Sequence, residues 1–130
     1  MTIDEHINHW LNSAIHDLDT AETLLKAKKY DWALFIGYLV LEKTLKALFV
    51  MNNNNKIPPK IHNLVRLSER AGIELTEQQK IFVDKVNDFN LEVRYPEFKD
   101  EFYLTITKEF AEDYFVKIRD FYQWLRSLIK

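Results

Sequence analysis

The residues of this chain that are best suited to chemistry surround an arginine at a predicted bend of the backbone. Arg94 is followed by Tyr95 and Pro96, and the proline disfavours a helical conformation at Tyr95. An arginine held beside a fixed bend can direct its planar guanidinium group at a phosphate. It can also simply bond carbonyl groups at a helix end, and the sequence leaves both interpretations open.

A second group of charges lies on a long apolar segment. Glu42 and Lys46 are spaced i, i+4 in the order that stabilises a helix by roughly a few tenths of a kcal/mol, and Lys43 lies beside Glu42. The same side of this segment carries three apolar residues that should be covered: Trp32, Phe35 and Leu39. A side that begins apolar and becomes charged is typical of an interface with a polar rim. The alternative is that these charges only solvate the helix.

The segment 56–70 is the only distinctly basic part of the chain. It contains one anion, Glu69, and four cations: Lys56, Lys60, Arg66 and Arg70. A charge cluster of this size is usually a solvated surface. The other interpretation is an anion or phosphate site next to His62.

Metal and nucleophile chemistry finds less support in the sequence. Three histidines lie on the polar side of the first predicted helix: His6, His9 and His16. The pair His6 and His9, spaced i, i+3, could bind a metal together with Asp17 or Asp19. We favour a solvated polar face there. The chain has no cysteine and only two glycines, which excludes thiolate sites and a glycine-rich phosphate loop. We therefore expect neither a metal nor a cofactor.

Composition predicts one folded domain over residues 1–130. Hydrophobic residues make up 47% of the chain and charged residues 29%, which is typical of globular proteins. The net charge of −2 does not favour wholesale binding to nucleic acid, and no apolar run is long enough to cross a membrane. The first residues do not resemble a signal peptide. We expect a cytoplasmic protein.

The elements that must position these residues are helices. The segment 30–51 is apolar almost all round, which predicts a central helix covered by others. A heptad pattern over 2–28 predicts an antiparallel partner for it, joined by a short link. Proline, glycine and capping patterns predict the remaining elements: a loop at 52–60, a helix at 61–71, a helix from 76 to about 91, an irregular connection at 97–104, and a last helix from 105 or 107 to the end. The predicted fold is an all-α, up-and-down bundle of about five helices.

Several of these motifs together resemble the HEPN family, the higher eukaryote and prokaryote nucleotide-binding domains. Trp10–Leu25 has the pattern W-L-x-x-A-x-x-D-L-x-x-A-x-x-L-L, and three further motifs follow in order: Tyr30-x-x-Ala33-x-Phe35, Glu42-Lys43-x-Leu45-Lys46-Ala47-Leu48 and His62-Asn63-Leu64. Arg94-Tyr95-Pro96 resembles the R-Y-P of the family. Tyr38 stands where many relatives carry glutamine. The resemblance covers nearly the whole chain.

The resemblance implies a homodimer with a polar cleft at or near its interface. It also implies partnership with a small nucleotidyltransferase, often as a toxin–antitoxin pair. Many relatives are metal-independent ribonucleases that use an R-x(4–6)-H motif. Arg94 is followed by ten residues without histidine, so the standard general acid or base is missing here.

Three functional hypotheses follow. The first is a non-catalytic dimeric module that binds a nucleotide or a nucleotidyltransferase, with a cleft lined by five candidates: Arg94, Tyr95, Lys43, Lys46 and His62. The second is a ribonuclease in which Arg94 stabilises the phosphorane and His62 is a non-standard acid or base. The third is a dimerisation scaffold without a ligand. We favour the first, and with it a protein that is not an enzyme.

Overall fold

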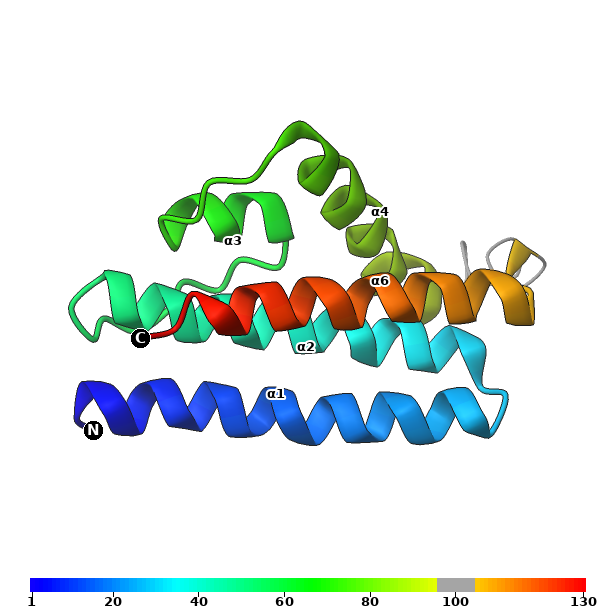
Figure 1. The fold of residues 1–130 in the computed structure, drawn as a ribbon, viewed down its shortest axis with the longest axis horizontal. Helices are drawn as coiled ribbons and strands as arrows, with labels where there is room; N and C mark the ends of the chain where they lie inside the picture. The colour runs from blue at the N-terminus through cyan, green and yellow to red at the C-terminus, as the bar shows by residue number, and fades with distance from the viewer. Residues whose placement is uncertain (96–104) are drawn as a thin grey trace.

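The computed structural model describes residues 1–95 and 105–130, and these residues form five α-helices without strands (Figure 1). The helices are α1 (Ile3–Lys26), α2 (Tyr30–Asn52), α3 (Leu64–Arg70), α4 (Glu77–Arg94) and α6 (Lys108–Ser127). The predicted all-α bundle is therefore confirmed. The irregular connection expected at 97–104 lies outside the described residues. None of the described helices is both long and apolar enough to cross a lipid bilayer.

Helix α1 forms the antiparallel hairpin with α2 that the short link predicts. It begins with a capping box, in which the Thr2 hydroxyl accepts from the Glu5 N–H and the Glu5 carboxylate accepts from the Thr2 N–H. The turn to α2 passes through Lys28, which has a φ of 65°. Figure 1 shows α1 lying along α2 over most of its length.

Helix α2 is the centre of the bundle and contacts each of the other four helices. Its largest apolar side chains are fully buried: Leu34, Tyr38, Leu41, Leu45 and Leu48. Gly37 permits the close approach of α6, because a Cβ atom there would lie 3.1 Å from the Cδ1 atom of Ile118. The predicted central helix is thus the element that the others cover.

Several helix ends differ from the sequence-based expectation, and the last helix ends at Ser127 rather than at the end of the chain. Helix α3 begins at Leu64 rather than Ile61, because the Asn63 side chain caps it by accepting from the N–H of Arg66 at 3.1 Å. Helix α4 continues to Arg94, beyond the expected end near Leu91. Pro96 does disfavour a helical Tyr95, whose φ and ψ are −107° and 123°, but its effect reaches only that residue.

Helix α4 carries the chain back, so that α6 runs in the same direction as α2 (Figure 1). The Thr107 hydroxyl caps α6 by accepting from the N–H of Phe110 at 3.0 Å. Figure 1 shows α1 on one side of α2 and the pair α3 and α4 on the other. This arrangement leaves one side of α2 facing the loop before α3 and the end of α4, which carry His62 and Arg94.

Candidate functional site

One side of α2 carries aromatic side chains in its first half and charged side chains in its second half. Its members follow the spacing of one helical face, and we call this set the α2 face: Trp32, Phe35, Tyr38, Leu39, Glu42 and Lys46. Phe35 and Leu39 are half-buried, whereas Trp32 is 39% exposed. The sequence predicted this change from apolar to charged, and the structure places a functional candidate at each end of it.

The charged end of the α2 face is built on a buried carboxylate. The Oε1 atom of Glu42 lies 2.8 Å from Nδ1 of His62 and 3.4 Å from Nζ of Lys46. The Glu42 side chain is only 6% exposed, but the His62 ring is 63% exposed. A buried carboxylate therefore holds an imidazole that faces solvent, which is the arrangement that orients histidines in catalytic and binding sites.

Tyr38 holds the backbone of the same histidine. Its hydroxyl donates a hydrogen bond to the carbonyl of His62. Burial raises the pKa of the Tyr38 phenol far above its ordinary value of 10.0, the charge of Glu42 raises that pKa further, and the charge of Arg94 opposes both. Tyr38 consequently remains a hydrogen-bond donor at any physiological pH.

The aromatic end of the α2 face is covered by Arg94. The guanidinium carbon lies 5.5 Å from the ring centre of Phe35 and 5.9 Å from that of Tyr95, both within cation–π range. Its Nε donates to the carbonyl of Asn90 in its own helix at 3.1 Å. Arg94 does bond a helix-end carbonyl, as the simpler interpretation predicts, but the residue remains exposed.

The five candidate residues do not all lie together. Lys46 belongs to the α2 face, and Arg94 and His62 contact its members. Tyr95 contacts Arg94. Phe35 and Glu42, the contacts of Arg94 and His62, are two helical turns apart, about 10 Å along the axis. Lys43 turns toward α1, where its ammonium lies 2.6 Å from Asp17 and 2.7 Å from Ser13.

Lys46 is shared between the α2 face and α1. Besides its pairing with Glu42, its ammonium lies 5.0 Å from the ring centre of Trp10. The side chain is 14% exposed, so most of it is committed to these two contacts. It acts more as the counter-charge of Glu42 than as a free cation.

Sequence reasoning missed the roles of Tyr38 and Glu42 toward His62. Both contacts span at least 20 positions of the chain and cross a loop, as the separations of 24 and 20 residues show. A signal did exist, because Glu42 is the only acidic residue within the apolar part of α2 after Asp31. A carboxylate in such a helix requires a partner.

The other two candidate sites, the histidines of α1 and the basic segment 56–70, do not form a binding arrangement among the described residues. His6 uses Nδ1 to contact the side-chain oxygen of Asn55 at 2.9 Å. Across residues 1–95 and 105–130, no three potential metal ligands of the His, Cys, Asp or Glu type converge. The cations of the basic segment are all exposed: Lys56, Lys60, Arg66 and Arg70.

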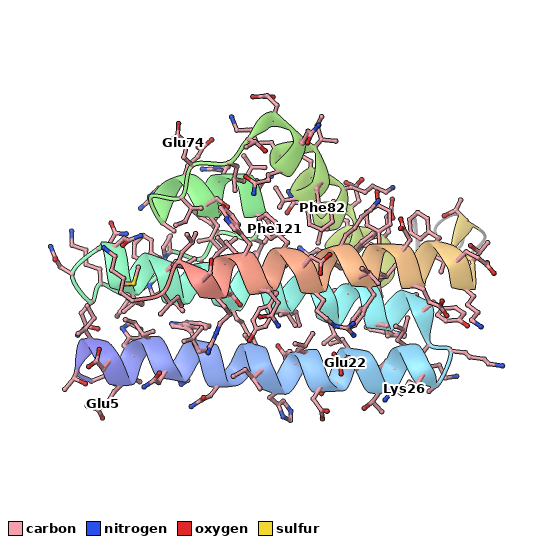
Figure 2. The ribbon with its side chains drawn as sticks, in the orientation of Figure 1. Glu5, Glu22, Lys26, Glu74, Phe82 and Phe121 are labelled. Carbon is pink, nitrogen blue, oxygen red and sulfur yellow. The ribbon has the colours of Figure 1, made fainter. Side chains whose placement is uncertain are left out.

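A groove of about 900 Å³ lies between α4 and α6, apart from the α2 face. Figure 2 shows Phe82 of α4 and Phe121 of α6, whose ring centres are 5.6 Å apart. Phe82 also stacks on Tyr114, and Phe121 packs on Trp124. The aromatic rings therefore contact one another along the groove, which contains neither Arg94 nor His62.

Comparison with known proteins gives a family and a fold. The model of the HEPN domain family matches residues 7–128. A crystal structure of TT1696 from Thermus thermophilus has a similar fold, with a TM-score of 0.78 and 18% sequence identity. That likeness covers 95% of this chain and 98% of the other. No curated protein shows a significant match.

Proposed function

This chain belongs to the HEPN domain family, and from that premise we propose that it is a small helical module that binds a nucleotide on the α2 face. The observation that carries the proposal is that Arg94 and His62 contact the same face of one helix. A guanidinium group suits phosphate oxygens, and an oriented imidazole suits a second polar group of the same ligand.

The aromatic end of the face supports this assignment. Tyr95 is 46% exposed and contacts the Arg94 guanidinium, and Trp32 is 39% exposed and packs on Phe35, the other ring that Arg94 contacts. Stacking of a base on an aromatic side chain is worth about 1–3 kcal/mol in proteins that bind single-stranded nucleic acids. A cation and aromatic rings at one end, with a polar group two turns away, match the parts of a nucleotide.

Isothermal titration with ATP and with GTP tests the proposal. Arg94→Ala should weaken binding at least tenfold, since a charged hydrogen bond is worth about 1.5–3 kcal/mol. The matched control is Arg126→Ala, which removes an arginine in the last turn of α6, outside both the α2 face and the basic segment. Absence of heat with both nucleotides at millimolar concentration would count against a binding role.

A ribonuclease is the second candidate, and the Glu42–His62 pair favours it. An imidazole oriented by a carboxylate is a competent general base, and Arg94 could stabilise a phosphorane. The separation of about 10 Å along α2 argues against both acting on one phosphate, so we rank this function second. The test is cleavage of RNA by wild type and Arg94→Ala: equal activity in both, or none in either, would end the hypothesis.

We also propose that the module forms a homodimer and engages a nucleotidyltransferase, as its motifs suggest. Light scattering in solution should then give twice the 15.6 kDa mass of one chain. Titration with the product of the adjacent gene would test the second partner. A dimer without affinity for nucleotide or nucleotidyltransferase would instead support the scaffold hypothesis.

A further inference from the structure

We infer that Glu42 fixes His62 in the tautomer whose outward nitrogen is a hydrogen-bond acceptor, and that this acceptor selects a ribose hydroxyl of the ligand. The inference rests on the proposed nucleotide-binding function and adds to it the sugar that the site takes. It assigns Glu42 as a positioning residue and His62 as the residue that contacts the ligand.

The first step concerns the proton on the ring. An ionised carboxylate only accepts hydrogen bonds, so the 2.8 Å contact with Glu42 requires a hydrogen on Nδ1 of His62. A neutral imidazole carries one N–H, which leaves Nε2 without a hydrogen. Lys46 lies 3.4 Å from the same Glu42 oxygen. Its charge neutralises the carboxylate and leaves the contact between Glu42 and His62 in place.

The second step concerns orientation. An exposed imidazole is ordinarily free to rotate, but this one is held at the ring by Glu42 and at its backbone carbonyl by Tyr38. The chain after it is also fixed, since the N–H of Leu64 donates to the Asn87 side chain at 2.9 Å. Within the part of the chain that the structure describes, Nε2 has no partner, although the ring is 63% exposed. A polar acceptor is therefore presented to solvent in one orientation.

The third step concerns the ligand group. Near pH 8 the oxygens of a nucleotide phosphate are acceptors, and an acceptor at Nε2 cannot hydrogen-bond them. A ribose hydroxyl is a donor, and the 2′-hydroxyl is the group by which a protein distinguishes RNA from DNA. The phosphates are then assigned to Arg94, whose contact residue Phe35 lies two helical turns from Glu42 along α2.

The tautomer can be measured on the wild-type protein without any ligand. In nitrogen-15 NMR spectra of the imidazole rings at pH 8, above the ordinary titration range of histidine, His62 should show a protonated Nδ1 and an unprotonated Nε2. The chain has four histidines, so His62→Ala assigns the signals, and exposed His9 serves as an internal reference. A predominant Nε2–H form of His62 would overturn the inference.

The sugar preference is measured by titration with ATP, 2′-deoxy-ATP, 3′-deoxy-ATP and 2′,3′-dideoxy-ATP. Wild type should bind ATP about fivefold to tenfold more tightly than the dideoxy compound, the usual effect of one hydrogen bond. The two singly deoxygenated compounds identify which hydroxyl is read. Equal affinity for ATP and dideoxy-ATP would refute the inference and leave the nucleotide-binding proposal intact, whereas no binding of any nucleotide would refute both.

The role of Glu42 is tested with Glu42→Leu/Lys46→Met, which removes the pair without leaving a buried charge unpaired. We expect the ATP preference over dideoxy-ATP to fall to about twofold or less, and the His62 tautomer to shift toward Nε2–H. The matched control is Glu22→Gln/Arg119→Met, which removes a 3.1 Å ion pair between α1 and α6 away from the α2 face. An unchanged preference and tautomer in the Glu42 variant would overturn the positioning role.

Discussion

At the scale of single residues, Tyr38 connects the core of the bundle to the candidate site. Its ring is fully buried in the centre of α2, and its hydroxyl bonds the carbonyl of His62. The same side chain therefore contributes to folding through its ring and to the site through its oxygen. A substitution that removes only the oxygen separates these two contributions.

We expect Tyr38→Phe to lower the free energy of unfolding by about 0.5–1.5 kcal/mol, because it deletes one hydrogen bond and keeps the buried ring. Urea denaturation followed by circular dichroism measures this loss. Tyr122→Phe is the control, since Tyr122 is buried and its hydroxyl has no partner among the described residues. Equal effects of the two substitutions would mean that the bond to His62 contributes nothing.

The Tyr38 phenol also predicts how stability depends on alkaline pH. Its pKa in the folded state is raised above 10.0 by burial, so above pH 10 the unfolded chain releases this proton while the folded chain keeps it. The contribution of the Tyr38 phenol to the free energy of unfolding is therefore fully present below pH 10 and is lost as the pH rises toward the pKa of the folded state. The unfolding free energy of wild type should fall more steeply above pH 10 than that of Tyr38→Phe. Parallel curves from pH 8 to 11 would contradict this.

The pairing of Glu42 with His62 marks the limit of residue-level prediction. The sequence identified Glu42, Lys46, His62 and Arg94 as separate candidates, because each is a charged or titratable residue beside a structural break or on an apolar helix. It could not show that Glu42 meets His62, since that contact depends on the path of the loop between α2 and α3. The i, i+4 rule instead favoured Lys46, which is the more distant of the two partners of Glu42.

At the scale of elements, the close contact between α2 and α6 depends on one glycine. A Cβ atom at Gly37 would lie 3.1 Å from Cδ1 and 3.5 Å from Cγ2 of Ile118. Because Cδ1 is the flexible end of its side chain, a single methyl group can be accommodated by a small shift. A β-branched side chain cannot.

Gly37→Val should therefore destabilise the protein by about 1–3 kcal/mol through overpacking. In an Ile118→Ala background the same substitution should cost clearly less, because the atoms it meets have been removed. Urea melts of the four proteins form a double-mutant cycle that measures the coupling. Additive effects would show that Gly37 does not set the distance between α2 and α6.

Long helices were predictable from the sequence, but their ends depend on single contacts. The buried positions of α1, α2 and α6 follow the helical periodicity of their apolar residues, which fixes the type and face of each element. The start of α3 depends on the Asn63 cap, and the end of α4 depends on how far the influence of Pro96 extends. That second end bears on the proposed site, since it makes Arg94 the last residue of α4.

At the scale of the whole molecule, the net charge of the protein does not favour attraction of a negatively charged nucleotide. The net charge is −2, so the proposed binding depends on the local arrangement at the α2 face rather than on the overall field. Under this proposal, the placement of Arg94 and His62 becomes the main determinant of affinity. That placement depends on the bundle being folded as one unit, since the two residues reach α2 from different segments.

Because α2 contacts every other described helix, we expect the molecule to unfold in a single transition. Far-UV and near-UV circular dichroism should give the same urea midpoint.

Leu41 is fully buried in α2, and Leu41→Ala should lower the free energy of unfolding by about 2–5 kcal/mol and shift both midpoints together. Ile81→Ala is the control, because Ile81 is 70% exposed and its loss should change stability by less than about 0.5 kcal/mol. A loss below about 1 kcal/mol for Leu41→Ala, or two separate midpoints, would mean that α2 does not unite the bundle.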